Sequence, residues 1–209
     1  MKYFNVLGLS LLLASQEGWA EWDLSRLRAL GAECLLGTTE VDDSKLTVKF
    51  SRFAAMLEPF VNEHSMNVAR CSIAVGFKVP PRHRLATLTH RVFAHVNKNS
   101  DSQVSLQVSM VLNNQTFSFS GTLPEDSVLD QKVLLYKSFV PGDSFMNCSN
   151  SASDVNVTLN WQLLADATTL GGNARLTLAG DDLWTDTWIE TRPCEESAHA
   201  FALADTQIR

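Results

Sequence analysis

The sequence predicts an exported, all-β protein, an antiparallel β-sandwich of about nine strands with two disulfides. Three observations predict this fold. Apolar and polar residues alternate with a period of two along most of the chain, turn residues separate the alternating segments, and four cysteines follow an N-terminal segment typical of a secretory signal. With 209 residues, 45% of them hydrophobic, the chain is long enough for one domain with a buried core.

Residues 1–20 have the three parts of a signal peptide. Lys2 supplies the positive charge, and the apolar segment 4–14 is far shorter than the ~20 residues that span a bilayer. Gly18-Trp19-Ala20 then places small residues at the −3 and −1 positions of a cleavage site before Glu21. The sequence therefore predicts a soluble mature chain without a transmembrane segment, secreted or periplasmic/extracellular.

All four cysteines lie in the predicted mature chain, at Cys34, Cys71, Cys148 and Cys194. An even number in an exported chain favours two disulfides over a metal or catalytic site, and the spacing contains no CxxC. Three pairings are possible, of which the sequential one is the simplest. Each sequential bridge would close a loop of about forty residues and stabilise the fold by roughly 4 kcal/mol.

Nine segments are predicted as strands, because every second residue in them is apolar or because β-formers dominate them. The strongest are 46–50, 71–79, 104–112, 155–163 and 174–178, and the weaker are 85–96, 116–120, 133–139 and 183–191. Turn signals such as Pro80-Pro81, Asn113-Asn114 and Gly171-Gly172 separate them. Because no long helix intervenes, the strands are expected to pair antiparallel.

The remaining segments complete the expected organisation. Cys71 shares a strand face with Ile73 and Val75, which places its bridge in the core. Leu24, Leu27 and Leu30 have the spacing of a short helical turn. We therefore expect one β-sandwich domain over residues 21–194 and a tail over residues 195–209, either a frayed helix or disordered.

Short motifs along the chain resemble a known family. They are Gly31-Ala32-Glu33-Cys34, Leu46-Thr47-Val48-Lys49-Phe50-Ser51-Arg52-Phe53, Arg70-Cys71-Ser72-Ile73 followed by Pro80, Phe117-Ser118-Phe119-Ser120-Gly121, and the last two cysteines. In this order they resemble the domain-of-unknown-function family 4360, a group of small secreted proteins. The resemblance covers about residues 25–194 and implies an exported, disulfide-bridged β domain. It brings no known activity with it.

Charge is unevenly distributed along the chain. The net charge of −6 and the pI of about 5.3 exclude a generally basic protein, so we expect no nucleic-acid partner. No acidic residue occurs between Glu63 and Asp101, a stretch that contains Arg70, Lys78, Arg82, Arg84, Arg91 and Lys98. These side chains could attract an anionic envelope polymer, polysaccharide or lipid headgroup. Alternatively, they form ordinary cross-strand pairs with acidic strands such as 181–196.

Trp184-Thr185-Asp186-Thr187-Trp188 is the leading candidate for a binding motif. In a strand, Trp184, Asp186 and Trp188 share one face, with Asp186 between the two indoles. Such a face could stack on sugar rings while Asp186 accepts hydrogen bonds from hydroxyl groups. The alternative is that both tryptophans belong to the core and that Asp186 pairs with an arginine.

Neither a metal site nor a catalytic motif is evident. His90 and His95 are five residues apart, and His83 and His90 are seven apart, so each pair faces opposite sides of a strand. This spacing favours histidines that are on the surface or partly buried. The acidic residues around Asp181 fit a solvated turn better than a calcium loop. Because no GxSxG, HExxH or phosphate-binding glycine loop is present, we predict no catalytic residue, no metal and no cofactor.

The sequence therefore predicts a binding module whose partner is a polysaccharide or another envelope component. In this hypothesis Trp184 and Trp188 stack, Asp186 hydrogen-bonds, and Arg82, Arg84 and Arg91 attract anionic groups. Two alternatives remain: a secreted hydrolase with a composite site, and a structural or protein-interaction domain without a small ligand.

Overall fold

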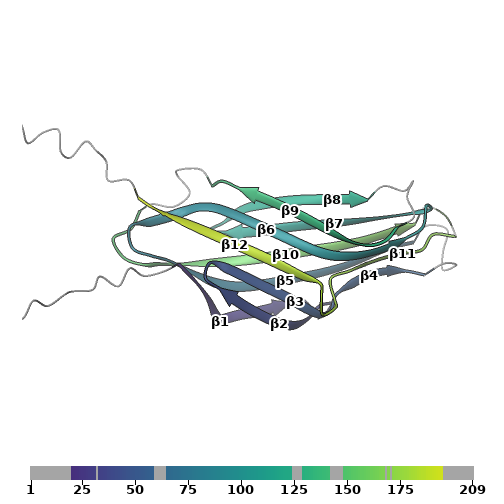
Figure 1. The fold of residues 1–209 in the computed structure, drawn as a ribbon, viewed down its shortest axis with the longest axis horizontal. Helices are drawn as coiled ribbons and strands as arrows, with labels where there is room; N and C mark the ends of the chain where they lie inside the picture. Colours follow the sequence, from purple (N-terminus) through teal and green to yellow (C-terminus); the bar gives the residue numbers. More distant parts are fainter. Residues whose placement is uncertain are drawn as a thin grey trace, which may run out of the picture.

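The computed structural model of the chain describes residues 20–31, 33–58, 65–123, 129–141, 148–167, 169 and 171–194. These residues form twelve β-strands in two layers whose ladders are all antiparallel, which confirms the predicted β-sandwich (Figure 1). Apart from Ala20, the predicted signal peptide lies outside the described residues, as does the predicted tail. Within the described ranges no helix is long and apolar enough to cross a membrane.

The first layer, sheet A, contains five strands in the order β1-β5-β10-β7-β8. Their bounds are β1 (Glu21–Leu30), β5 (Ser65–Val79), β10 (Ser153–Ala167), β7 (Ser102–Leu112) and β8 (Gln115–Leu123). The long strands β5 and β10 pair along their whole length, which makes them the frame of this sheet.

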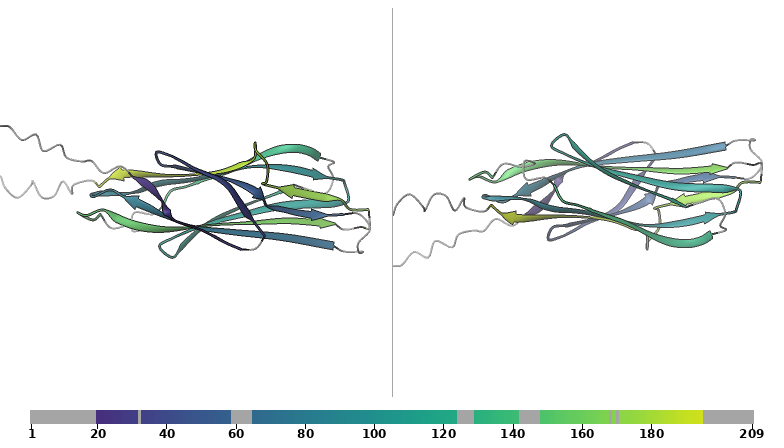
Figure 2. Two further views of the ribbon diagram at one scale, coloured as in Figure 1. Left: turned by 90° about the horizontal axis from the view of Figure 1, so that it is seen from below. Right: turned by 90° about the horizontal axis from the view of Figure 1, so that it is seen from above.

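The second layer, sheet B, contains seven strands in the order β2-β3-β12-β6-β11-β4, with β9 also paired to β6. Their bounds are β2 (Leu35–Asp42), β3 (Lys45–Arg52), β4 (Ala54–Leu57), β6 (His83–Lys98), β9 (Leu129–Phe139), β11 (Ala174–Thr177) and β12 (Trp184–Pro193). One edge of β6 pairs with β12 and then β11, while its other edge pairs with β9. The strands of both layers run along the length of the molecule (Figure 2).

All nine predicted strands are present, and three further strands, β1, β2 and β4, were not predicted. The expected helical turn at Leu24, Leu27 and Leu30 is wrong, because these residues belong to β1. A register shift between Asp23 and Arg28 interrupts the alternation of β1 against β5. The spacing of three between its leucines therefore comes from an irregular strand.

Alternation along the strands builds the core between the two sheets. On β10, Val155, Val157, Leu159, Trp161 and Leu163 are all buried, as the sequence predicted. Trp161 contacts the ring of Phe50 from sheet B, with the ring centroids 5.5 Å apart. The two layers are therefore joined by large side chains that interdigitate.

Two disulfides join the sequential cysteines, so the simplest of the three pairings is confirmed. Cys34 and Cys71 are only 3% and 2% exposed, and their bridge lies in the core as expected. The second bridge joins Cys148, just before β10, to Cys194, just after β12. Beside it, Arg82 donates its backbone N–H to the Ser149 carbonyl and accepts a hydrogen bond from the Cys194 backbone N–H.

Candidate functional site: an aromatic and arginine face on sheet B

The candidate site lies on the outer face of sheet B, where β12 presents its tryptophans. Thr185, Thr187 and Ile189 on β12 point into the core and are at most 1% exposed. Trp184, Asp186 and Trp188 alternate with them and therefore share the outer face, as the sequence predicted. Both tryptophans are partly buried, so they belong neither to the core nor to a fully open surface.

Arg91 on β6 is paired with Asp186 on the neighbouring strand β12. Its Nη2 donates to Asp186 Oδ2 at 3.0 Å, while Thr47 Oγ1 on β3 donates to Asp186 Oδ1 at 2.7 Å. The Asp186 side chain is only 7% exposed and that of Arg91 is 38% exposed. Both carboxylate oxygens of Asp186 therefore accept a hydrogen bond, and Asp186 holds Arg91 in place. This is the pairing with an arginine that the sequence offered as the alternative role of Asp186.

The Arg91 guanidinium also lies against both indoles. Its Cζ is 4.0 Å from the ring centroid of Trp188 and 5.2 Å from that of Trp184. Trp184 in turn lies beside Phe93, with centroids 5.6 Å apart and a tilt of 32°. Each cation–π contact contributes about 0.5–2 kcal/mol depending on its exposure, so these contacts fix the orientation of the guanidinium.

Strand β9 extends this surface beyond β6. The register places Tyr136 opposite Arg91 and Leu134 opposite Phe93, on the same outer face. Tyr136 is 69% exposed and Leu134 is 49% exposed. We call the surface formed by Trp184, Trp188, Phe93, Arg91 and Tyr136 the aromatic–arginine face. The contribution of Tyr136 was missed in the sequence, because only strand pairing brings β9 next to Arg91.

Charged side chains lie beside one end of the aromatic–arginine face. His95 Nε2 lies 3.0 Å from Asp130 Oδ1, and Lys132 is paired with Asp182. The hydrogen bond from Lys132 lowers the pKa of Asp182 below its ordinary value. Lys132 and Asp182 neutralise each other, which leaves the aromatic rings as the distinguishing feature of the face.

Arg82 and Arg84 do not join this cluster. Arg82 lies in the turn before β6, and Arg84 is opposite Arg192 where β12 ends. At ~3.3 Å per residue along β6, Arg84 is roughly 23 Å from Arg91. Of the three arginines proposed from the sequence, the structure brings only Arg91 to Trp184 and Trp188.

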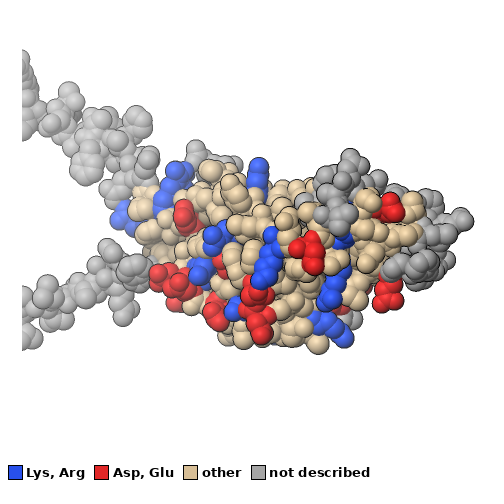
Figure 3. Space-filling model, turned by 45° about the vertical axis from the view of Figure 1, so that its right-hand side comes forward, with Lys and Arg blue, Asp and Glu red and all other residues tan. Residues whose placement is uncertain are grey.

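The basic stretch between Glu63 and Asp101 is divided among several places. Lys78 pairs with Glu21 and Arg91 with Asp186, as the cross-strand alternative expected. Lys98 is only 2% exposed and donates from Nζ to the carbonyls of Asn99 and Ser102, so its predicted place on a basic surface is wrong. Figure 3 shows basic and acidic side chains interspersed on the visible face.

His90 forms a hydroxyl–imidazole pair with Thr187 inside the core. Trp161 Nε1 donates to His90 Nε2 at 3.1 Å, so His90 Nδ1 carries the proton and donates to Thr187 Oγ1 at 2.8 Å. Burial lowers the pKa of His90 from its ordinary 6.5 to about 3. Because His90 and Thr187 are each only 1% exposed, this pair is structural and not an accessible nucleophile with its base.

The sequence placed His90 on the surface or partly buried, and this prediction is wrong. His90 occupies the inward position between Leu88 and Val92 on β6, and that alternation was the signal that could have located it. His95 faces outward, so the prediction that the two histidines face opposite sides is confirmed. Over the described ranges, no three His, Cys, Asp or Glu side chains gather as a possible metal site.

The pockets of the described surface include the following two. One, of about 260 Å³, lies on the outer face of sheet A and is lined by Arg70, Cys71, Ser72, Gln107, Ser109, Asn160, Trp161 and Gln162. The other, of about 470 Å³, lies near the break between β3 and β4 and contains Glu33, Arg52, Met56 and Arg175 among its lining residues. Neither pocket contains a histidine, so neither gathers the histidines and carboxylates expected of a composite hydrolase site.

The fold defines the protein as a disulfide-bridged antiparallel β-sandwich with an aromatic outer sheet face. No family model matches the chain. No curated protein matches it either, and its resemblance to the domain-of-unknown-function family 4360 stays a prediction.

Among solved structures, the chain is similar to a CBM4 carbohydrate-binding module at 10% identity, with a TM-score of 0.28 and coverage of 82% of this chain and 88% of that one. It is also similar to the module TmCBM61, solved with β-1,4-galactotriose, at 8% identity and a TM-score of 0.21, covering 83% and 86%. The enzymatically active domain of bacteriophage CBA120 tailspike protein 4 follows at 12% identity and a TM-score of 0.23, covering 73% and 19%. Because these TM-scores are low, neither the fold assignment nor a function of this chain is based on these similarities.

Proposed function

We propose that this protein binds carbohydrate through the aromatic–arginine face of sheet B, after export to a secreted or periplasmic/extracellular location. The observation that carries the proposal is the fixed Arg91 guanidinium, held by Asp186 and stacked on Trp188, beside the exposed ring of Tyr136. Rigid aromatic rings next to a few fixed hydrogen-bond donors suit a ligand with apolar ring faces and hydroxyl edges.

The contacts assign separate roles to these side chains. Tyr136 is the exposed ring on which a sugar can stack, and the outer edges of Trp184 and Trp188 extend that platform. Arg91 offers its remaining Nη N–H donors to sugar oxygens, while the hydrogen bond from its Nη2 to Asp186 fixes its position. Because the guanidinium is already held, little conformational entropy is lost when the ligand binds.

A binding screen of the exported protein against purified envelope and extracellular polysaccharides, at low and high salt, tests this proposal. Stacking and neutral hydrogen bonds are weakly screened by salt, so binding should persist at high salt. Tyr136→Ala and Trp188→Ala should each weaken binding by about tenfold, the equivalent of 1.4 kcal/mol for an aromatic anchor. Met66→Ala is the matched control, since Met66 is 66% exposed and lies on sheet A.

Two results would contradict the proposal. One is the failure of every polysaccharide in the screen to bind. The other is binding that neither Tyr136→Ala nor Trp188→Ala weakens, which would place the ligand elsewhere on the molecule.

A protein partner is the second candidate for this face, and exposed aliphatic residues favour it. Leu134 is 49% exposed and Val140, just after β9, is 78% exposed. Protein interfaces are enriched in Tyr, Trp and Arg at their centres. Capture of a protein rather than a polysaccharide, lost in both Tyr136→Ala and Leu134→Ala, would favour this candidate.

A further inference from the structure

The outer face of sheet A carries a second polar site, on the opposite side of the sandwich from the aromatic–arginine face. Strand pairing aligns Arg70, Gln162, Gln107 and Ser120 in one row across β5, β10, β7 and β8. The next row contains Ser72, Asn160, Ser109 and Ser118. Neighbouring strands are about 4.8 Å apart, so these polar side chains form a continuous array.

A pocket of about 260 Å³ opens where the two rows are adjacent. Its sides are Arg70, Ser72, Gln107, Ser109, Asn160 and Gln162, and we call it the sheet A pocket. Cys71 and Trp161 also line it, but their side chains are at most 2% exposed and point into the core, so they contribute main chain to the floor. The volume is below the ~300–1,000 Å³ of sites for drug-sized ligands and suits a single sugar unit.

Hydrogen bonds fix part of this surface in advance. Ser72 Oγ donates to Asn160 Oδ1 at 2.5 Å, and Asn160 Nδ2 donates to Ser109 Oγ at 3.2 Å. Arg70 Nε donates to Gln162 Oε1 at 3.2 Å, which orients the guanidinium over the pocket. A ligand therefore meets side chains whose positions are already set.

The pocket groups that have no hydrogen-bond partner among the described residues are mostly donors. They include the Arg70 Nη atoms, the Gln162 side-chain N–H groups, the whole Gln107 amide and the Ser109 hydroxyl hydrogen. No carboxylate among the described residues forms an ion pair with Arg70. Glu33 accepts a hydrogen bond from the Arg70 backbone N–H and not from its guanidinium.

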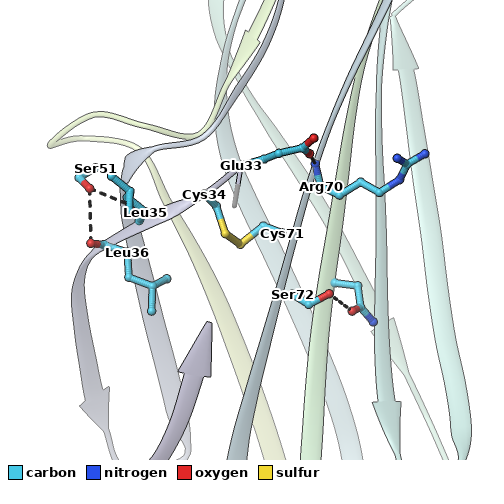
Figure 4. The surroundings of a disulfide bond; sticks show 9 residues. Glu33, Cys34, Leu35, Leu36, Ser51, Arg70, Cys71 and Ser72 are labelled. Atoms are coloured by element: carbon cyan, nitrogen blue, oxygen red, sulfur yellow. Dashed lines mark hydrogen bonds between the residues drawn. A yellow bond between two sulfur atoms is a disulfide. The ribbon is translucent and has the colours of Figure 1, made fainter. Parts of the chain in front are cut away.

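The core disulfide supports this arrangement from behind. Because β1 pairs with β5 only as far as Leu30 opposite Ser72, the Arg70 backbone N–H lies past the end of that ladder. The Cys34–Cys71 bridge brings Glu33 to this N–H, as Figure 4 shows. Figure 4 also shows the Arg70 side chain extending away from the disulfide.

From this geometry we infer that the sheet A pocket binds an acidic oligosaccharide, with the carboxylate of a uronic acid unit on Arg70. A carboxylate matches the planar donors of an arginine that lacks an acidic partner. The amides of Gln107 and Gln162 and the hydroxyls of Ser72 and Ser109 would bind the ring hydroxyls of the same unit. This site shares no residue with the aromatic–arginine face.

Calorimetric titration of the exported protein with tetramers of mannuronate, galacturonate and glucuronate tests the inference, each beside the neutral tetramer of the corresponding hexose. At least one acidic tetramer should bind, and more tightly than its neutral counterpart. Arg70→Gln should weaken that binding by about tenfold or more, because it removes a charged hydrogen bond. Gln107→Ala should also weaken it, and since Gln107 has no side-chain partner among the described residues, this variant should fold normally.

Lys78→Gln is the matched control, because Lys78 lies on the same strand and outer face as Arg70 but ~27 Å away. Equal weakening by Arg70→Gln and Lys78→Gln would overturn the inference in favour of general charge attraction. Failure of all three acidic tetramers to bind, or equal affinity for acidic and neutral tetramers, would overturn it as well. Loss of binding in Tyr136→Ala but not in Arg70→Gln would overturn it and support the proposed sheet B site instead.

Discussion

Trp161 and His90 join the two sheets by a hydrogen bond across the core. The indole N–H on β10 of sheet A donates to the imidazole Nε2 on β6 of sheet B, at 3.1 Å. Thr187 on β12 accepts from the other side of the same ring. Both ring nitrogens of the imidazole are thereby satisfied, which explains how a largely apolar core accommodates a histidine.

This neutral histidine makes stability depend on pH. The folded-state pKa of His90 is about 3, below the ordinary 6.5 expected in the unfolded chain, so the unfolded state binds more protons between these values. The stabilisation is complete above pH 6.5 and is lost as the pH falls toward 3, by about 1.4 kcal/mol per pH unit. Urea unfolding at pH 7 and pH 5 should show this slope in the wild type and a smaller one in His90→Gln. Equal slopes would mean that His90 is not buried in its neutral form.

Thr187→Val tests the acceptor side of the His90 network. The substitution conserves shape but leaves the His90 Nδ1–H without an acceptor, so the free energy of unfolding should fall by about 1–3 kcal/mol. Thr185→Val is the control, since Thr185 is equally buried on β12 and makes a long contact of 3.4 Å to the Val48 carbonyl. Chemical denaturation should separate the two variants, and similar losses in both would argue against a special role for the network.

Arg91→Lys tests whether the planar guanidinium matters on the aromatic–arginine face. Lysine keeps the charge near Asp186 but loses the flat stack on Trp188, so the free energy of unfolding should fall by about 1–2 kcal/mol. Tryptophan emission should change as well, because the indole environment changes. Arg175→Lys on β11 of the same sheet is the control and should stay within about 0.5 kcal/mol of the wild type. Indistinguishable variants would show that charge alone holds the pair.

The two disulfides should differ in their resistance to reduction. Cys34 and Cys71 are almost completely buried, whereas Cys148 is exposed and Cys194 is partly buried. Mild reductant without denaturant, followed by alkylation and mass spectrometry, should therefore label Cys148 and Cys194 first. Simultaneous labelling of all four cysteines would indicate that the native state opens as a whole before either bridge is reduced.

The strands that the sequence predicted are those with one buried face. On β7 and β10, alternation follows directly from the side of the sheet on which each residue lies. The missed strand β2 is at a sheet edge and has register shifts near Leu36, so few of its residues are buried and no alternation is visible. The missed strand β4 has only four residues and follows β3 after a break at Phe53.

The candidate site was predictable only within single strands. Trp184, Asp186 and Trp188 share a face because side chains alternate along a strand, so the sequence alone predicted this part of the site. Which arginine meets them depends on the register between β12 and β6, and the place of Tyr136 depends on that between β6 and β9. These pairings join segments far apart in the chain, so local pattern could not choose Arg91 over Arg82 and Arg84.

Strand β12 is the last strand of the chain among the described residues, yet it lies inside sheet B between β3 and β6. Until residues 184–193 are present, β3 and β6 lack the strand that joins them, and sheet B is divided into separate pieces. Folding of this layer must therefore await synthesis of the far end of the chain, rather than proceed strand by strand from the N-terminus. A chain truncated before Trp184 should remain unfolded in sheet B.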